Sequence, residues 1–349
     1  MKKKNRVRFF LILLLPAVLV AISVIVVDPF FHYHAPINGL PYVLSEERYQ
    51  NDGIVKHFKY EAVITGSSTS QNFKTSDVNR LWGMDAVKVT FAGSTYKEQD
   101  RIVKVAASRN SDLKMVIRGL DISRINSDKD DMGYDEYPEY LYDDNPLNDY
   151  DYIFNKDVAV IIGKIAARIL QHEGPESFDE YSNWSGIKTY GKQAVLSTFK
   201  RVKELKEKEA PLSEADYTRI YDNITQNIIN TAKENPDTEF YIFFSPPSVY
   251  YWDAVIRTGS YDNVYDELKY TYSLLLEEDN IKLYSFFDKI DITGNIDNYM
   301  DTIHYSGDIN TLILEWIKTG EGLMTRDNYI GHLDKVKEIY KSFDYESVF

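Results

Sequence analysis

The sequence predicts an α/β protein built around a parallel β-sheet. Two observations lead to this expectation. Short apolar runs that end in glycine, serine or proline indicate buried strands that lead into loops. Segments with helical spacing of apolar residues separate these runs, and such alternation is typical of right-handed crossovers between parallel strands. With 349 residues, 44% of them hydrophobic, the chain has enough apolar material for the core of such a sheet.

The N-terminal segment precedes this pattern and predicts a membrane anchor. Residues 1–8 carry five basic side chains, and residues 9–27 then run without a charge. Nineteen helical residues span about 28 Å, close to the thickness of the hydrocarbon layer. The basic flank predicts a cytoplasmic N-terminus, a single-pass anchor in the cell membrane and an extracytoplasmic body. A cleaved signal peptide is the alternative, since Ala21-Ile22-Ser23 resembles a cleavage site. The length of the apolar run favours the uncleaved anchor.

Residues 28–60 form an aromatic lead-in that we expect to be irregular and close to the membrane, and residues 61–349 form the α/β domain. Its first half alternates strand and helix: Ala62 to Thr65 leads into Gly66-Ser67-Ser68, and a helix is expected at residues 96–108. The predicted strands cover residues 62–65, 86–91, 113–117, 239–244 and 281–287.

Residues from about 122 to 212 interrupt the alternation, and we interpret them as an insertion or cap on the sheet. They contain an apolar helix candidate at residues 158–170 and a charged one at residues 198–210. The segment from Ser127 to Asp151 is rich in aspartate and tyrosine. It is interpreted either as an acidic solvated loop or as a surface on which sugars stack; its tyrosines are Tyr134, Tyr137, Tyr140 and Tyr142.

The α/β pattern returns after the insertion. A Ser-x-x-Asp capping signal begins a predicted helix at residues 213–235. Further helices are expected at residues 263–278, 307–319 and 325–345.

Charge and cysteine content exclude several classes of function. Lys and Arg number 40 and Asp and Glu 54, so the net charge is −14, which argues against binding to nucleic acid. The chain has no cysteine, which excludes disulfides, thiolate metal sites and cysteine nucleophiles. No residue pattern indicates a metal or another cofactor, and we expect none.

The loops that follow the carboxyl ends of parallel strands are where such sheets place their ligands. Asp301 precedes His304 by three residues in the loop after the last strand. A carboxylate at this spacing can bond the imidazole Nδ1–H and leave Nε2 free, which is the orienting half of a Ser-His-Asp triad. Ser67 and Ser68, directly after the first strand, can supply the hydroxyl. Gly93 and Asp121 follow the second and third strands.

These blocks resemble those of the SGNH/GDSL hydrolase superfamily. Gly66-Ser67-Ser68-Thr69 is similar to the family's first block, Gly-Asp-Ser-x, and Asp301 to His304 matches its last block, Asp-x-x-His. Gly93 stands at the place of the second block's oxyanion-hole glycine. The counterpart of the third block, Gly-x-Asn-Asp, is Gly119-Leu120-Asp121-Ile122, with Asp where the family has the Asn that donates to the oxyanion.

The resemblance implies a three-layer, flavodoxin-like parallel sheet and acyl-transfer chemistry. It implies Ser68 as nucleophile, His304 as base and Asp301 as its orienting acid. The N–H groups of Ser68 and Gly93 would form the oxyanion hole, with Asp121 at the position of the third donor. With Ser67 in place of the family's Asp and a membrane anchor beside it, the chain looks like an anchored subset. That subset includes the D-alanyl-lipoteichoic-acid biosynthesis protein and polysaccharide O-acetyltransferase-like members.

The expected function is therefore an extracytoplasmic serine esterase or O-acyltransferase that acts on a cell-envelope polysaccharide or teichoic acid. The expected partners are the membrane, that envelope glycan or teichoic acid, and a membrane-bound acyltransferase. The alternative is a catalytically inactive SGNH-like protein that binds an envelope polymer or scaffolds a membrane acyltransferase. Asp121 keeps this alternative open, because an ionised carboxylate cannot donate a hydrogen bond to an oxyanion.

Overall fold

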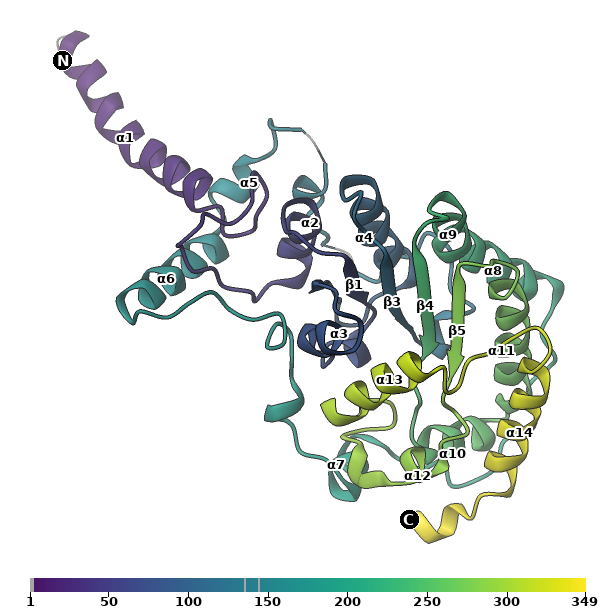
Figure 1. The fold of residues 1–349 in the computed structure, drawn as a ribbon. Helices are drawn as coiled ribbons and strands as arrows, with labels where there is room; N and C mark the ends of the chain where they lie inside the picture. Colours follow the sequence, from purple (N-terminus) through teal and green to yellow (C-terminus); the bar gives the residue numbers. More distant parts are fainter. Residues whose placement is uncertain (1–2, 135, 144) are drawn as a thin grey trace.

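A parallel β-sheet forms the centre of the molecule, as predicted (Figure 1). The computed structural model describes residues 3–134, 136–143 and 145–349, and of residues 3–13 the backbone only. Within this part of the chain the sheet has five strands in the order β2-β1-β3-β4-β5, all paired in parallel. The strands are β1 (Ala62–Thr65), β2 (Ala86–Lys88), β3 (Met115–Leu120), β4 (Glu239–Phe244) and β5 (Ile281–Ser285). This is the flavodoxin-like strand order.

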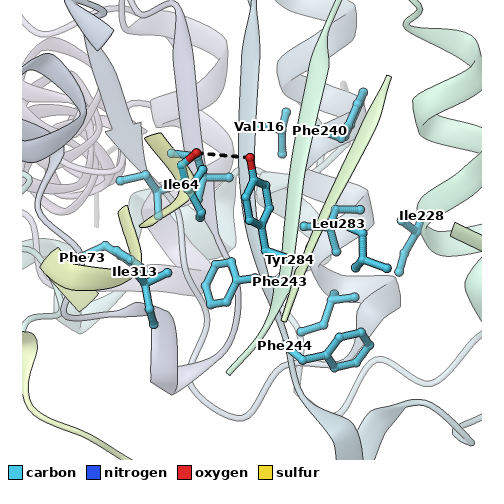
Figure 2. Close-up of a cluster of buried hydrophobic side chains, with 14 of the residues drawn as sticks. Ile64, Phe73, Val116, Ile228, Phe240, Phe243, Phe244, Leu283, Tyr284 and Ile313 are labelled. Carbon is cyan, nitrogen blue, oxygen red and sulfur yellow. Dashed lines mark hydrogen bonds between the residues drawn. The ribbon is translucent and has the colours of Figure 1, made fainter. Parts of the chain in front are cut away.

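Helices on both faces of the sheet complete three layers. One face packs against α3 (Thr75–Trp82) and α13 (Gly307–Thr319). The other face packs against α4 (Tyr96–Arg109), α8 (Glu214–Ile224), α9 (Asn230–Glu234) and α11 (Tyr261–Leu275). Successive side chains of a strand point to opposite faces of the sheet. The buried apolar side chains of the strands therefore pack against the helices on each face. Figure 2 shows Phe73 and Ile313 beside Phe243, and Ile228 beside Leu283.

The remaining helices lie around these layers. They are α1 (Lys3–Val27), α2 (Glu47–His57), α5 (Tyr150–Ile153), α6 (Lys156–Leu170), α7 (Lys192–Thr198), α10 (Val249–Thr258), α12 (Ile290–Thr293) and α14 (Tyr329–Ser342). The predicted helix at 213–235 exists but is interrupted by a π-helical turn at Thr225–Ile229. Its capping box forms, since Ser213 accepts from the N–H of Asp216 and the Asp216 carboxylate accepts from the N–H of Ser213.

Two sequence expectations were wrong. Residues 199–213 contain no helix; this segment instead runs along the end of α10, where Lys206 N donates to Arg257 O at 2.9 Å and Glu209 N to Gly259 O at 3.1 Å. Pairing with a distant segment replaces the local hydrogen bonds that a charged helix would have made. The lead-in is not wholly irregular, because it contains α2. The polar residues of α2 are buried and bonded: Gln50 donates to the oxygens of Pro29 and Val43.

The helix α1 projects away from the body of the molecule (Figure 1). Its C-terminal end packs on the rest, where Val24 joins a small apolar cluster with Phe30, Tyr152 and residues of α6. Within the part of the chain that the structure describes, no helix is both long enough and apolar enough to cross a bilayer. The anchor predicted at residues 9–27 begins among side chains that lie outside the described part, and it stays a prediction.

Candidate active site

The turn after β1 presents Ser68 at the carboxyl edge of the sheet. Ser68–Ser70 form a short 3₁₀ turn in which Ser70 N donates to Ser67 O at 2.9 Å. The turn packs tightly on its surroundings: a Cβ at Gly66 would lie 2.2 Å from Ser70 Oγ, and a Cβ at Gly119 would lie 2.4 Å from it. Gly66 also has φ of +148°, a conformation that side chains with a Cβ rarely adopt. Glycine at both positions is therefore needed for the turn to pack in this place.

The structure brings Ser68, His304 and Asp301 into one hydrogen-bonded chain. Ser68 Oγ lies 2.7 Å from His304 Nε2, although 236 positions separate the two residues. His304 Nδ1 lies 2.6 Å from Asp301 Oδ2. The imidazole is thus held by the carboxylate on one nitrogen and meets the hydroxyl with the other.

Asp301 is fixed by its own loop. Its Oδ1 accepts the backbone N–H groups of Ile303 at 2.9 Å and His304 at 2.8 Å. Burial acts to raise the pKa of the Asp301 carboxyl, but the bonds from the His304 ring and from these N–H groups outweigh it, and the pKa lies below its ordinary value. Asp301 is therefore ionised at neutral pH and can hold the imidazole N–H.

Trp184, which comes from the insertion, covers the serine and the histidine. Its indole N–H donates to Ser68 O at 3.1 Å, and its ring meets the His304 ring edge to face at 5.6 Å. Asn72 fixes this tryptophan, since its buried Oδ1 accepts the backbone N–H groups of Trp184 and Ser185, each at 3.1 Å. The sequence analysis missed both residues. An isolated tryptophan beside Ser185-Gly186 in a polar segment was the one available signal.

The two backbone groups expected at the oxyanion hole are free to donate. Within the described part of the chain, neither the Ser68 N–H nor the Gly93 N–H makes a hydrogen bond. Gly93 is exposed with φ of +67°, and its carbonyl oxygen accepts from Arg124 at 3.0 Å. That bond fixes the loop after β2 to the segment after β3.

Asp121 follows β3 and lines a pocket of about 200 Å³ beside the 3₁₀ turn of Ser68–Ser70. Burial raises the pKa of its carboxyl, while the Ser67 and Thr69 hydroxyls, the His304 ring and Arg124 act in the opposite direction. The pKa of Asp121 therefore lies above its ordinary value, and a carboxyl can donate a hydrogen bond only in its protonated form. The pocket wall is mostly apolar and includes Ile122, Pro247, Tyr251 and Ile303.

Among the residues that the structure describes, no group of three or more histidine, aspartate or glutamate side chains is placed to hold a metal ion. The chemistry that this arrangement can perform by itself is nucleophilic attack by an alcohol on a carbonyl carbon.

Comparison with protein-family profiles finds no match. Comparison with curated proteins also finds none. Among solved structures, the chain is similar to one from Streptococcus pneumonia described as "a putative platelet activating factor", with 10% sequence identity and a TM-score of 0.40. The match covers 79% of this chain and 91% of that one. A likeness at this distance carries no argument about activity.

Proposed function

We propose that this protein is a serine ester hydrolase or O-acyltransferase of the SGNH type, with Ser68 as nucleophile, His304 as general base and Asp301 as the acid that orients it. The observation that carries the proposal is the continuous path from Ser68 Oγ to His304 Nε2 at 2.7 Å and from His304 Nδ1 to Asp301 at 2.6 Å. A hydroxyl in contact with an imidazole that a carboxylate orients is the arrangement that activates serine in acyl transfer.

The reaction has two halves. In the first, His304 Nε2 takes the hydroxyl proton while Ser68 Oγ forms a bond to the ester carbonyl carbon. The tetrahedral intermediate then breaks the bond to the alcohol oxygen, which leaves with the proton held by His304. In the second half, water or an acceptor hydroxyl gives its proton to His304 and attacks the acyl carbon. The bond to Ser68 breaks, and Ser68 Oγ regains the proton.

The negative charge of each tetrahedral intermediate needs hydrogen-bond donors. The unbonded N–H groups of Ser68 and Gly93 suit this role, and one such donor is typically worth about 2.7–4 kcal/mol. Asp121 in its protonated form is the third donor that we propose. Its raised pKa, caused by burial, supports this role.

We place the reaction at the outer face of the cell membrane, on a polymer of the cell envelope. The basic flank and the apolar run at residues 9–27 support this placement. Apolar side chains of α1 such as Leu15 and Val26 stay exposed, as do Val160 and Leu170 of the neighbouring α6. Lipid contact would remove this apolar area from water.

Labelling of the full chain with a fluorophosphonate tests the catalytic proposal, since this reagent reacts covalently with an activated serine. We expect labelling of the native chain and its loss in Ser68→Ala. Ser197→Ala is the matched control, because Ser197 is an exposed serine of α7 whose hydroxyl bonds the oxygen of Ala194 in its own helix. A native chain that no fluorophosphonate labels would instead favour an inactive protein that binds a polymer or scaffolds an acyltransferase.

A second measurement separates hydrolase from transferase. The acyl-enzyme is formed from a chromogenic short-chain ester, and released acid is compared with acylated product when a glycan acceptor is added. Transfer that exceeds hydrolysis identifies an acyltransferase.

A further inference from the structure

A second pocket lies close to the turn that carries Ser68, with Gln71 and Trp184 in its wall. Its volume is about 400 Å³, and it lies between the start of α2, the tyrosine-rich part of the insertion and the segment that carries Trp184. Three of its lining residues are aromatic: Tyr49, Tyr134 and Trp184. We call this pocket the aromatic cleft.

Two residues that line the aromatic cleft connect it to the proposed catalytic residues. Trp184 lines the cleft and also contacts Ser68 and His304. Gln71, another lining residue, lies three positions after Ser68, at the end of the nucleophile turn. A molecule held in the cleft therefore lies beside the tryptophan that contacts Ser68 and His304.

The wall of the cleft is held in place by buried polar contacts. Arg48 lies over the Tyr134 ring at 4.5 Å and forms an ion pair with the buried Glu98 at 2.7 Å. Glu47 accepts from Gln71 at 2.8 Å and from the backbone N–H of Ala92 at 2.8 Å, which ties α2 to the loops after β1 and β2. The Arg48 contact holds the Tyr134 ring before a ligand arrives, which lowers the side-chain entropy that binding costs.

The lining chemistry fits a sugar. A pyranose ring has an apolar C–H face that packs on aromatic rings, and hydroxyl groups around its edge that need hydrogen-bond partners. The cleft offers both, because Tyr134 is 53% exposed and the carboxylates of Glu46 and Glu136, the Gln71 amide and the Ser182 hydroxyl surround the rings.

The charge of the cleft selects among envelope polymers. Glu46, Glu47 and Glu136 line it against one cation, Arg48, which is already paired with Glu98. The whole chain carries a net charge of −14. This surface repels a chain of phosphodiesters and accepts a neutral sugar or one with an amino group.

We propose that the aromatic cleft binds a sugar residue of a neutral or amino-bearing polysaccharide and presents its hydroxyl or its ester to Ser68. This inference rests on the proposed function for what happens to the bound sugar, but not for the binding itself. It favours a polysaccharide over a teichoic acid as the polymer.

Equilibrium binding to the full chain carrying Ser68→Ala tests the cleft without turnover. The probes are chitotetraose, its fully deacetylated form and a poly(glycerol phosphate) chain, measured by isothermal titration calorimetry. We expect at least one sugar probe to bind and Tyr134→Ala to raise its Kd by about tenfold, as loss of an aromatic stacking surface implies. Tyr134→Phe retains the ring and should change the Kd by less than about twofold.

Tyr221→Ala is the matched control, because Tyr221 is an exposed tyrosine of α8 that does not line the cleft, and it should leave binding unchanged. Three results would overturn the inference: no sugar probe binds, only the phosphate polymer binds, or Tyr134→Ala and Tyr221→Ala behave alike. Fluorophosphonate labelling of the native chain reports on Ser68 independently, so a failed cleft and a failed nucleophile give different results.

Discussion

At the scale of single residues, two carboxyl groups beside His304 have pKa shifts of opposite sign. Burial is the largest influence on both, and it raises the pKa of Asp121, whereas hydrogen bonds from His304 and Ile303 bring the pKa of Asp301 below its ordinary value. Groups whose environments separate their pKa values in this way can divide acid and base roles between them. In the proposed mechanism Asp301 orients the imidazole as a carboxylate, and Asp121 is the group that donates when it is protonated.

Replacement of Asp301 by Asn tests the orienting role. The amide keeps the size of the side chain, but it cannot stabilise the imidazolium as a carboxylate does, so kcat should fall on the order of 10⁴-fold with little change in KM. Steady-state ester hydrolysis measures both constants. Equal activity in the native chain and in Asp301→Asn would contradict the role.

Replacement of Asp121 by Asn tests the donor role. We expect Asp121→Asn to keep or raise kcat at neutral pH, because an amide N–H donates at every pH, whereas the carboxyl donates only when it is protonated. The native rate should decline as Asp121 ionises with rising pH, and this decline should be absent in the Asn variant. The pH profile of kcat shows the difference. His304 and Arg124, the charged groups that also face Asp121, are unchanged in both proteins.

Asp121→Ala measures how much this donor contributes to kcat. Loss of one oxyanion donor should lower kcat by about 10²–10³-fold. If the Asn and Ala variants lose activity equally, Asp121 is not a donor.

At the scale of elements, the edge strand β2 supports the nucleophile turn through a buried lysine. Lys88 Nζ donates to Gln71 O at 2.6 Å and to Phe73 O at 2.9 Å, immediately after the 3₁₀ turn of Ser68–Ser70. Burial lowers the pKa of this ammonium group to about 7. The lysine thus holds the end of the turn in place but is costly to bury when it is charged.

This lysine gives stability a defined pH dependence. The unfolded chain keeps the Lys88 proton up to its ordinary pKa of about 10.4, whereas the native state releases it near pH 7, so Lys88 makes stability rise with pH between these values. From pH 7 to pH 9 the native chain should gain up to about 3 kcal/mol relative to Lys88→Met. Urea unfolding of both proteins at pH 7 and pH 9 measures this gain in unfolding free energy. An equal change in unfolding free energy in the two proteins would contradict a buried, uncharged Lys88.

The accuracy of sequence-based prediction also differs by element. The expected strands at residues 62–65 and 239–244 agree with β1 and β4 because both are continuous apolar runs buried in the sheet. The helix α2 escaped prediction because its buried face includes Gln50, Asn51 and Asp52, which hide the apolar periodicity. The charged segment at residues 198–210 was predicted as a helix but is none. Its hydrogen-bond partner is the end of α10, which lies far away in the sequence.

At the scale of the whole molecule, strand topology explains which site residues could be foreseen. Ser68 and His304 both follow strands of one parallel sheet, whose carboxyl ends share an edge, so their approach could be expected from strand order alone. Trp184 and Asn72 could not be foreseen, because the path of the insertion over the site depends on tertiary packing.

The proposed placement at a membrane is also tested on the whole molecule. The full chain should cosediment with uncharged phosphatidylcholine vesicles, because apolar burial and not charge would hold it there. A chain that starts at residue 28 should stay in the supernatant and still be labelled at Ser68. It retains Asp28, whose carboxylate caps the backbone N–H groups of His32, Tyr33 and His34. Vesicle binding that does not depend on residues 1–27 would contradict the anchor.

The separation of 236 positions between Ser68 and His304 also bears on how the protein is made. A ribosome adds residues from the N-terminus at about 5–20 per second, so the serine emerges more than about ten seconds before its imidazole exists. A nascent chain has the alcohol but no group to take its proton. On the proposed mechanism, reactivity towards esters begins only when synthesis is nearly complete, and a chain truncated before residue 304 has none.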